Sequence, residues 1–389
     1  MVNILKNFKK EEFILKNHPT FLVPLFVFVI LQEIFSRIGG KKSRESLERL
    51  GSNFGQQLAV FLRKKYKRKS SMEIYSAMLM QLSFLGLGEF NVIRKLKNKC
   101  IVIKNSFNPL AAQYKKSFGI QGKGIDFFTL GILKGSFSEI FQCDAEGTEV
   151  ACAACNKPHC VYEIKWISNK KIIFEIPLDL DKLDVSHEFS YNHLIKRILK
   201  SGQCSLMNGQ LKIWNISCLN LPFPLIELFA IEAGKNSNEA EPVVDFLCDI
   251  QTQRAVSFQR DKFGIKERGK LLNNLFGQQE MILGLFGKIK LEKNAMIIEL
   301  NRCIPFDQFI KLNGTDKNFK APYTMALVRN LAIRVLNKDV KHIGLRVMQN
   351  ELREIRALLT ERIKMKRTII KKEYENVIIE KTKHKYFLS

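Results

Sequence analysis

The chain has 389 residues, of which 46% are hydrophobic and 26% are charged, and its formal net charge is +25. This length suits two or three ordinary domains, and this composition excludes an extended disordered protein. The positive charge attracts nucleic acid, anionic lipid or acidic partners, although solvated lysines in a lysine-rich composition explain it as well.

The first predicted element is an apolar run at Phe21–Leu31, which is similar to the core of a signal peptide. The acidic residues Glu11 and Glu12 spoil the basic flank of such a peptide, and Pro24 interrupts the run. Its eleven residues are too few to span a bilayer. We therefore predict a buried helix here and a cytoplasmic protein.

Two segments of the chain show the same order of elements. Each begins with a proline-containing apolar stretch, continues through a long amphipathic helix and reaches a Leu-Gly-Leu sequence. This sequence stands at residues 85–87 in the first segment and at residues 283–285 in the second, at an offset of 198. Internal repetition of this kind indicates two copies of one fold.

Strand and helix candidates follow in each copy. Alternating β-branched residues predict strands at Cys100–Lys104 and Ala295–Leu300. The helices predicted at Ile125–Phe141 and Ala321–Leu336 align at an offset of 195. The expected fold class is α/β (α+β), with two tandem domains that each pack several helices on a small, mostly antiparallel sheet.

The domain boundary is placed near residue 185. Residues 1–185 would form the first domain, residues 186–360 a degenerate second copy, and residues 361–389 a basic C-terminal helix or tail. Around this boundary we predict two strands, a helix and a third strand, at Cys160–Trp166, Lys171–Leu178, His187–Lys200 and Leu211–Ser217.

Four of the nine cysteines lie within eighteen residues, at Cys143, Cys152, Cys155 and Cys160. Together with Glu149, two of them form the spacing Glu-x2-Cys-x7-Cys. Thiolate and carboxylate ligands at such short spacing suit a tetrahedral Zn²⁺ site, whereas a long chain without a signal peptide does not suggest a disulfide framework. The alternative is two buried free thiols beside a surface glutamate.

The second copy does not repeat these residues. At an offset of 195, the positions of Asp126, Glu149, Cys152 and Cys160 are occupied by Ala321, Gly344, Val347 and Ile355. Because four polar positions are lost together, we infer that they act as one unit in the first copy.

Several features of the first copy identify a known family. They are the apolar start with Pro24, the glycine pairs 51/55 and 131/135, the asparagine-rich KNSFNPLA, and Glu-x2-Cys-x7-Cys ending in CVYEI. With them the first copy resembles the 4-vinyl reductase domains. The resemblance implies an α/β fold shared with haem nitric-oxide-binding domains and with subunits of the TRAPP tethering complex. It also implies kinship with hydrocarbon-binding sensor domains of transcription activators.

The resemblance also implies a zinc site. In those sensors the ion is held by an early cysteine, a glutamate and two later cysteines, and the last three fall on the Glu-x2-Cys-x7-Cys run described above. The early position falls on Asp126, which departs from the family pattern, so Cys143 and Cys155 are alternatives for the fourth ligand. Such a zinc would be structural, because four protein ligands leave no open position. The second copy resembles the family only in its helices and should bind no metal there.

Phenylalanines beside the predicted metal site are pocket candidates, namely Phe127, Phe128 and Phe137. Aromatic residues at helical spacing are more often plain core, but the family is known for apolar cavities, which implies a small hydrophobic ligand.

Basic segments suggest further partners. Residues 63–69 hold six cations in seven positions, and the tail adds more. Such runs are usually solvated, yet together they form a candidate patch for anionic lipid or nucleic acid. A second copy of the chain, in a homo-oligomer, is the remaining expected partner.

We expect a zinc-stapled, non-catalytic, sensor-type protein that binds a small hydrophobic molecule. The alternative is an interaction scaffold or membrane-tethering subunit similar to TRAPP components. A vinyl reductase acting on a tetrapyrrole ranks last, because the sequence carries no hydride-donor site and no nucleotide fingerprint.

Overall fold

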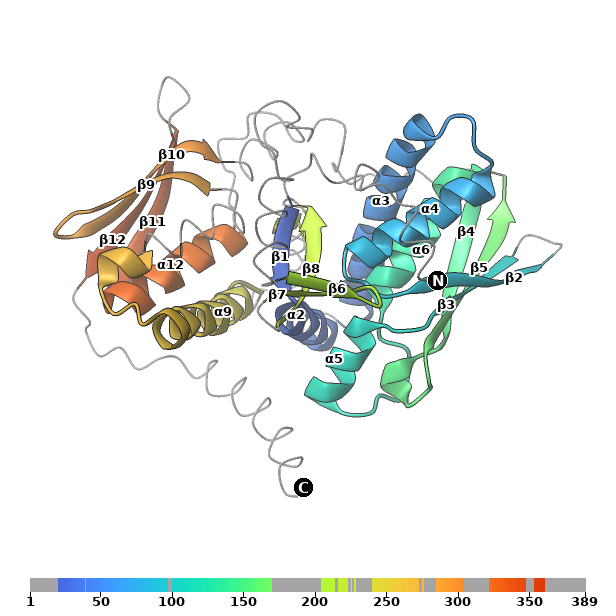
Figure 1. Ribbon diagram of the computed structural model, residues 1–389, viewed down its shortest axis with the longest axis horizontal. Coiled ribbons are helices and arrows are strands. Elements are labelled where there is room, and N and C mark those ends of the chain that lie inside the picture. The colour runs from blue at the N-terminus through green and yellow to red at the C-terminus, as the bar shows by residue number, and fades with distance from the viewer. Residues whose placement is uncertain are drawn as a thin grey trace. The chain divides into compact units, whose positions relative to one another are not determined.

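A computed structural model describes residues 20–169 except 39 and 97–99. Beyond these it describes 204–222 without 214–215, then 225, 227, 228, 240–272, 275, 285–303, 322–347 and 353–360. The chain divides into two compact units, residues 1–225 and residues 226–389 (Figure 1). Each unit combines helices with antiparallel sheet, so the predicted α/β class is confirmed.

The main sheet of the first unit is antiparallel, with the strand order β2-β3-β5-β4. Helix α6 packs on β4 and β5, and α3 packs across α6. The bounds are β2 (Phe90–Leu96), β3 (Cys100–Asn105), β4 (Asp144–Ala151), β5 (Cys160–Ser168), α3 (Gly40–Lys65), α4 (Ser71–Phe84) and α6 (Phe127–Phe141).

Local sequence determines where several helices begin and end. Ser70 and Glu73 form a capping box at the start of α4, in which each side chain satisfies a backbone N–H of the other residue. Asn108 caps α5 (Pro109–Phe118) by accepting from the Ala111 N–H, and Gly119 follows its last turn with φ of 81°. α5 lies against the short 3₁₀ turn η3 (Ala153–Cys155) between β4 and β5.

A second, four-stranded sheet of the first unit joins segments from both sequence repeats. Its order is β1-β8-β7-β6, and its strands are antiparallel. The predicted buried helix at Phe21–Leu31 is therefore wrong in its first residues, because these form a strand and the helix starts only after Pro24. The bounds are β1 (Thr20–Pro24), α2 (Leu25–Ile38), β6 (Cys204–Met207), β7 (Gln210–Ile213) and β8 (Ile216–Pro222).

The pairing of β1 with β8 follows the sequence repeat. At its centre Leu22 lies opposite Asn220, which is 198 residues later and therefore its own equivalent in the repeat. The neighbouring pairs, Phe21 with Leu221 and Val23 with Leu219, are symmetric about this point. Two equivalent strands thus meet antiparallel across a local two-fold relation, as identical strands do in an isologous contact.

The second unit repeats the main sheet of the first, with the order β11-β12-β10-β9. α12 has the same length as α6, and it begins and ends 195 residues later. It packs on β11 and β12, and α9 packs on α12. The bounds are α9 (Ala240–Phe263), β9 (Leu285–Leu291), β10 (Ala295–Cys303), α12 (Pro322–Leu336), β11 (Asp339–Val347) and β12 (Arg353–Thr360).

Some predicted features lie outside the described residues. They are the strand Lys171–Leu178, the helix His187–Lys200, the boundary near residue 185 and the basic tail 361–389. The predicted strand Leu211–Ser217 falls on β7 and the start of β8. Among the helices in the described ranges, none has the length and apolar character needed to cross a bilayer.

Candidate metal centre

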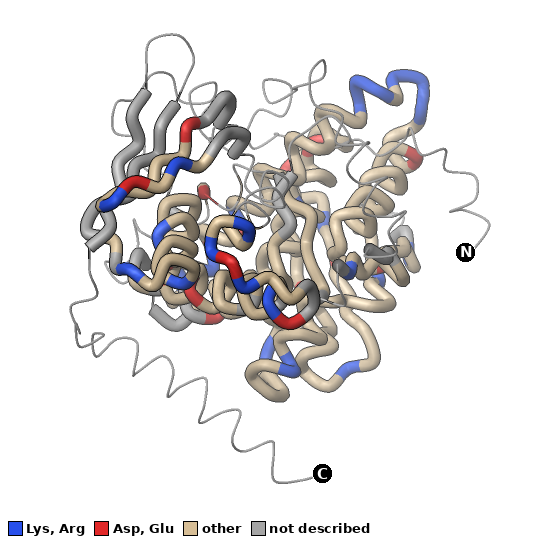
Figure 2. The backbone as a smooth tube through the Cα atoms, turned by 60° about the vertical axis from the view of Figure 1, so that its left-hand side comes forward, with Lys and Arg blue, Asp and Glu red and all other residues tan. Residues whose placement is uncertain are grey.

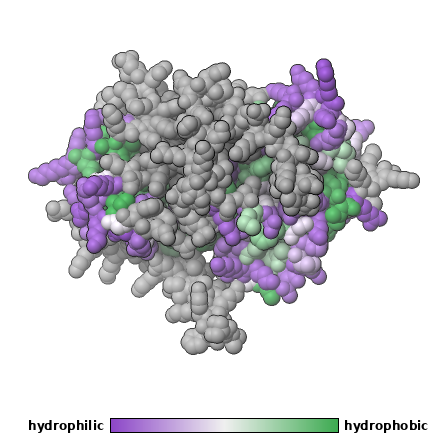
Figure 3. Space-filling view, in the orientation of Figure 1, coloured by the Kyte–Doolittle hydropathy of each residue, from purple (hydrophilic) through white to green (hydrophobic). Residues whose placement is uncertain are grey.

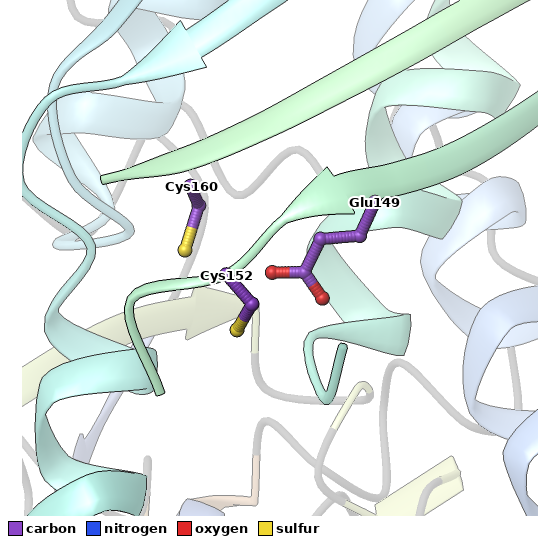
Figure 4. A group of neighbouring side chains, drawn as sticks. All are labelled: Glu149, Cys152 and Cys160. Carbon is purple, nitrogen blue, oxygen red and sulfur yellow. The ribbon is translucent and has the colours of Figure 1, made fainter. Parts of the chain in front are cut away.

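Three of the predicted ligands come together at one end of the main sheet. Glu149 lies near the end of β4, Cys152 directly follows this strand, and Cys160 opens the antiparallel neighbour β5. Figure 4 shows the carboxylate and the two thiols pointing toward one another. One ligand atom from each of the three residues lies within 4.8 Å of the others, so the group could hold a metal ion.

A tight turn positions the two sulfur atoms. After Cys152 the chain makes the 3₁₀ turn η3, closed by a 3.0 Å hydrogen bond from Cys155 N to Cys152 O. The same turn directs the Ala153 N–H to Cys160 Sγ at 3.2 Å. An N–H aimed at sulfur stabilises the thiolate, which is the form that binds metal.

Because they are buried close together, the carboxyl of Glu149 and the thiols of Cys152 and Cys160 cannot all ionise easily. Cys152 is 2% exposed and Cys160 is fully buried. A hydrogen bond from the Cys160 thiol lowers the pKa of Cys152 to about 6, while the pKa of Cys160 is raised by the same contact and by burial. Burial, and then the charge of Asp126, raise the pKa of Glu149 to about 9. A divalent cation would relieve this repulsion by stabilising all of the ionised forms together.

Glu149 itself carries the clearest sign that a cation fits. Its Oε2 accepts hydrogen bonds from the backbone N–H groups of Ile125, at 2.9 Å, and Asp126, at 3.2 Å. Its Oε1 is buried and receives no N–H or O–H hydrogen bond from the described residues. The backbone at the start of α6 therefore holds Oε2. Oε1 is a buried acceptor without such a donor among the described residues, as expected of an oxygen that binds a metal ion.

Asp126 lies beside this group but is engaged elsewhere. It caps α6, with Oδ1 accepting from the Thr129 N–H at 3.1 Å. Its Oδ2 accepts from Asn108 Nδ2, at 2.8 Å, and from the Tyr162 hydroxyl, at 2.9 Å. The side chain is 1% exposed, and burial raises its pKa. The assignment of Asp126 as a metal ligand stays a prediction.

The two alternative cysteines lie at different distances from Cys152. Cys143 immediately precedes β4 and Cys152 immediately follows it, and a strand of eight residues spans about 26 Å. Cys143 is thus too far away to share a metal with Cys152. Cys155 is partly exposed, and its pKa is raised to about 11 by partial burial and then by the charge and hydrogen bonding of the nearby Cys152.

The sequence analysis did not single out Asn108 and Tyr162, which lie beside the candidate metal centre. Both are buried, and they are hydrogen-bonded to each other at 2.9 Å as well as to Asp126. The signals were present: Asn108 directly precedes a proline at a helix start, and Tyr162 occupies a buried position on alternating β5. Both side chains donate to Asp126, and this shared acceptor could not be deduced from local sequence patterns.

The three predicted pocket phenylalanines do not lie in one place. Phe128 is fully buried against Phe28, with ring centroids 5.2 Å apart. Phe137 is 2% exposed and meets Tyr75 edge-on at 5.7 Å. Phe127 lies under the Arg44 guanidinium at 5.7 Å. Two of the three therefore pack in the core, and their role in a ligand pocket stays a prediction.

The second unit holds a different carboxylate at the start of the equivalent helix. Glu227 accepts from the backbone N–H groups of Tyr323, at 3.0 Å, and Thr324, at 2.9 Å, in the first turn of α12. It is 4% exposed, and burial raises its pKa. Gly344 and Val347 lie on β11, at positions where the first unit carries metal-type side chains.

A scan of protein-family models finds no match to this chain, and a search of curated proteins finds none either. Among solved structures, the chain is similar to the phenol-responsive sensory domain of the transcription activator PoxR, determined with phenol. The likeness covers 37% of this chain and 75% of that chain, at 15% identity and a TM-score of 0.35. A likeness this distant transfers neither ligand nor role, so membership of the 4-vinyl reductase family stays a prediction.

Proposed function

We propose that the first unit is a non-catalytic binding module stapled by a structural zinc ion. The observation that carries this is the group of Glu149, Cys152 and Cys160, whose ligand atoms lie within 4.8 Å of one another, together with the buried Glu149 Oε1, which receives no N–H or O–H hydrogen bond from the described residues. Two thiolates and one carboxylate form a donor set that zinc accepts and that hard cations such as Mg²⁺ do not.

Burial supports a structural role for this zinc. A catalytic zinc keeps a position open to water or substrate, whereas a structural zinc is closed. Both sulfur ligands are almost inaccessible to solvent, and η3 covers them on one side. The metal would connect the ends of β4 and β5 to the start of α6, because Glu149 also accepts hydrogen bonds from the backbone there.

Elemental analysis of freshly purified protein tests the staple. We expect one zinc per chain, which Cys152→Ser and Cys160→Ser each abolish. Cys100→Ser is the matched control, because Cys100 is also buried but lies at the start of β3, outside the ligand group. Chelation should loosen the first unit, since zinc binding is coupled to folding. Wild-type protein without zinc would refute the proposal.

The fourth ligand can be determined by counting sulfur atoms around the metal. Asp126 as the ligand gives two zinc–sulfur contacts in X-ray absorption, whereas Cys155 gives three, each near 2.3 Å. Asp126→Asn should then strip the metal in the first case and Cys155→Ser in the second. If both variants retain full zinc, neither residue is a ligand.

We further propose that the ligand of this module is a small hydrophobic molecule and that the protein acts as a sensor in the cytoplasm. Seven described cysteines are free thiols, a state that persists in reducing compartments. The ligand assignment rests on the sequence resemblance and on the apolar helices over the main sheet. Native mass spectrometry of the purified protein should detect a bound organic molecule in the zinc-loaded species.

An interaction scaffold is the second candidate function. It is favoured by exposed apolar side chains on three strands of the main sheet, Ile93, Val150 and Ile167, which are 54%, 53% and 47% exposed. A scaffold would use such positions to contact a partner or a second copy of the chain. Val150→Lys should then reduce partner recovery or self-association in light scattering, while leaving the zinc content unchanged.

A further inference from the structure

A pocket of about 640 Å³ lies at the end of the first unit formed by the α3–α4 turn. Three elements line it: the last turns of α3, the first turn of α4 and the end of α6. Its volume falls in the usual range for sites that bind small molecules. It is separate from the candidate metal centre, which lies beyond the N-terminal end of α6.

The pocket wall is strongly cationic. Four basic residues line it, Arg63, Lys64, Lys67 and Lys69, and one acidic residue, Glu139. Figure 2 shows Lys and Arg gathered along the turn between α3 and α4, and Figure 3 shows the hydrophilic surface over the same end of these helices.

The one carboxylate of the wall is already neutralised. Glu139 is 3% exposed, and its Oε1 lies 2.8 Å from Arg63 Nη1. Arg63 also donates to the Glu139 backbone carbonyl at 3.3 Å, and Gln142 donates to Glu139 Oε1 at 3.2 Å. This network fixes one side of the pocket and occupies the charge of Arg63. Lys69 lies 3.1 Å from Glu73 Oε1 in the first turn of α4, and Glu139 is the one carboxylate among the lining residues.

The pocket also has an apolar wall. Ile74, Ile140 and Phe141 line it from α4 and α6, and the first two are only 7% and 4% exposed. A cationic rim above apolar side chains fits an amphiphilic ligand, with a phosphate on the rim and an apolar body below it. An extended nucleic-acid strand would instead need a long groove with several aromatic stacking surfaces.

We propose that this pocket binds a phosphate monoester attached to an apolar group, presented either by a free metabolite or by a lipid headgroup. Lysine ammonium groups act as point charges toward phosphate, and charge-assisted hydrogen bonds are the strongest contacts that such a pocket offers. The inference does not depend on the metal centre or on its ligand.

The test compares two variants of the full-length protein with the same change in net charge. Lys64→Gln/Lys67→Gln removes two cations from the pocket. Lys41→Gln/Lys42→Gln removes two exposed cations from the first turn of the same helix, far from the pocket. Both variants should unfold at the wild-type temperature, since exposed charges and surface ion pairs contribute little to stability.

The soluble probe is dihexanoyl phosphatidic acid, with inorganic phosphate as competitor. We expect the pocket variant to bind it at least about tenfold more weakly, because tenfold corresponds to about 1.4 kcal/mol and each charge-assisted contact contributes that much or more. The control variant should stay within about twofold of wild type. Competition by inorganic phosphate identifies a free phosphorylated ligand.

Vesicle binding tests whether a lipid headgroup, rather than a free metabolite, presents the phosphate. Binding to phosphatidylcholine vesicles that contain phosphatidic acid, with no binding of the soluble probe, identifies a lipid headgroup, provided that the pocket variant again loses it selectively. Equal weakening in both variants would show diffuse attraction and overturn the proposal. The absence of wild-type binding to either probe would also overturn it, as would pocket-dependent binding of an oligonucleotide that neither probe displaces.

Discussion

Single residues of the candidate metal centre are held in place by other buried side chains. Asp126 accepts three hydrogen bonds, from Thr129, Asn108 and Tyr162, and its backbone N–H in turn holds Glu149. Partners of this kind orient ligands and fix their protonation states. The position of Glu149 therefore depends, through Asp126, on Thr129, Asn108 and Tyr162, which lie outside the candidate ligand set.

Removing the Tyr162 hydroxyl should expose this dependence. Tyr162→Phe leaves buried polar atoms of Asp126 and Asn108 short of a partner, so we expect a loss of about 2 kcal/mol in the free energy of unfolding. Tyr75→Phe is the control. The Tyr75 hydroxyl donates to the Leu133 carbonyl at 3.2 Å, which keeps a second donor in Ser136, so about 1 kcal/mol should be lost. Urea denaturation measures both, and equal losses would contradict the supporting role of Tyr162.

Glu227 should make the stability of the second unit pH-dependent. Burial raises the pKa of its carboxyl in the folded state above the ordinary 4.5. Below the ordinary value the carboxyl is protonated in both states, and its contribution to stability is complete. As the pH rises, the unfolded chain ionises first, so stability falls until the folded carboxyl ionises as well.

Glu227→Gln should flatten this pH dependence. The variant cannot ionise, although it loses about 1 kcal/mol because one oxygen must serve the N–H groups of both Tyr323 and Thr324. Glu267→Gln is the control, since Glu267 is exposed and forms a surface ion pair with Lys270. Thermal unfolding at several pH values measures the slope, and an unchanged slope in Glu227→Gln would refute the assignment.

At the scale of elements, the crossing of α3 and α6 depends on glycines. Gly51 and Gly55 lie on one face of α3, and Gly131 and Gly135 on one face of α6, because residues four apart share a face. A Cβ on any of the four would lie 1.8 to 2.3 Å from a backbone oxygen of the facing helix. The absence of side chains thus allows the two backbones to touch.

The second unit lacks glycines at the equivalent positions of α12, as it lacks the candidate metal ligands. Ala326 lies 195 residues after Gly131, and Asn330 lies 195 residues after Gly135. Asn330 Nδ2 donates to Asp245 Oδ1 on α9 at 2.7 Å. Arg334 forms a two-pronged pair with Asp249, at 2.7 and 2.8 Å. Polar contacts between side chains therefore replace the backbone contact.

Gly135→Ala should separate α3 from α6. The Cβ of the new alanine would lie 1.8 Å from the backbone oxygen of Ser52. The backbone of α3 cannot move aside as easily as a flexible side chain, so the two helices must separate. We expect a loss of about 3 kcal/mol, in spite of the better helix propensity of alanine. Gly122→Ala, where a Cβ meets nothing within 4 Å, should stay within about 0.5 kcal/mol of wild type. A neutral Gly135→Ala in chemical denaturation would contradict the crossing.

At the scale of the whole molecule, the sequence repeats and the compact units do not end at the same place. Strands β6, β7 and β8 follow the boundary near residue 185 that the repeat suggests, yet they lie in the first unit. Besides the pairing of β8 with β1, Gly88 N donates to Gly209 O at 3.0 Å, and Asn220 N donates to Leu85 O at 2.9 Å. The start of the second repeat thus completes the first unit.

Two fragments test this division. Residues 1–225 keep β8 beside β1, whereas residues 1–185 leave β1 and the loop 85–88 without their partners. Each unsatisfied buried group costs on the order of 1–3 kcal/mol, and several such groups match the whole stability of a domain. We expect the longer fragment to unfold cooperatively in a circular-dichroism melt and the shorter one to be largely unfolded. Equal melting temperatures would make the β1–β8 sheet dispensable.

The sequence by itself determined the repetition and the metal-type group. An offset of 195 relates β2 to β9 and α6 to α12, and an offset of 198 relates the last residues of β1 and β8, since each copy must bury the same faces to form the same sheet. Glu149, Cys152 and Cys160 were found because ligands on two strands joined by a tight turn are close in sequence as well as in space.

Only the tertiary structure decided the features that depend on distant residues. β4 carries Asp, Glu and Gly, which disfavour strands, and it is a strand because β5 and α6 hold it. The β1–β8 pairing, the partners of Asp126 and the basic pocket bring together residues that lie tens to about two hundred positions apart. Local patterns report which face of an element is buried, whereas the choice of partner depends on the path of the whole chain.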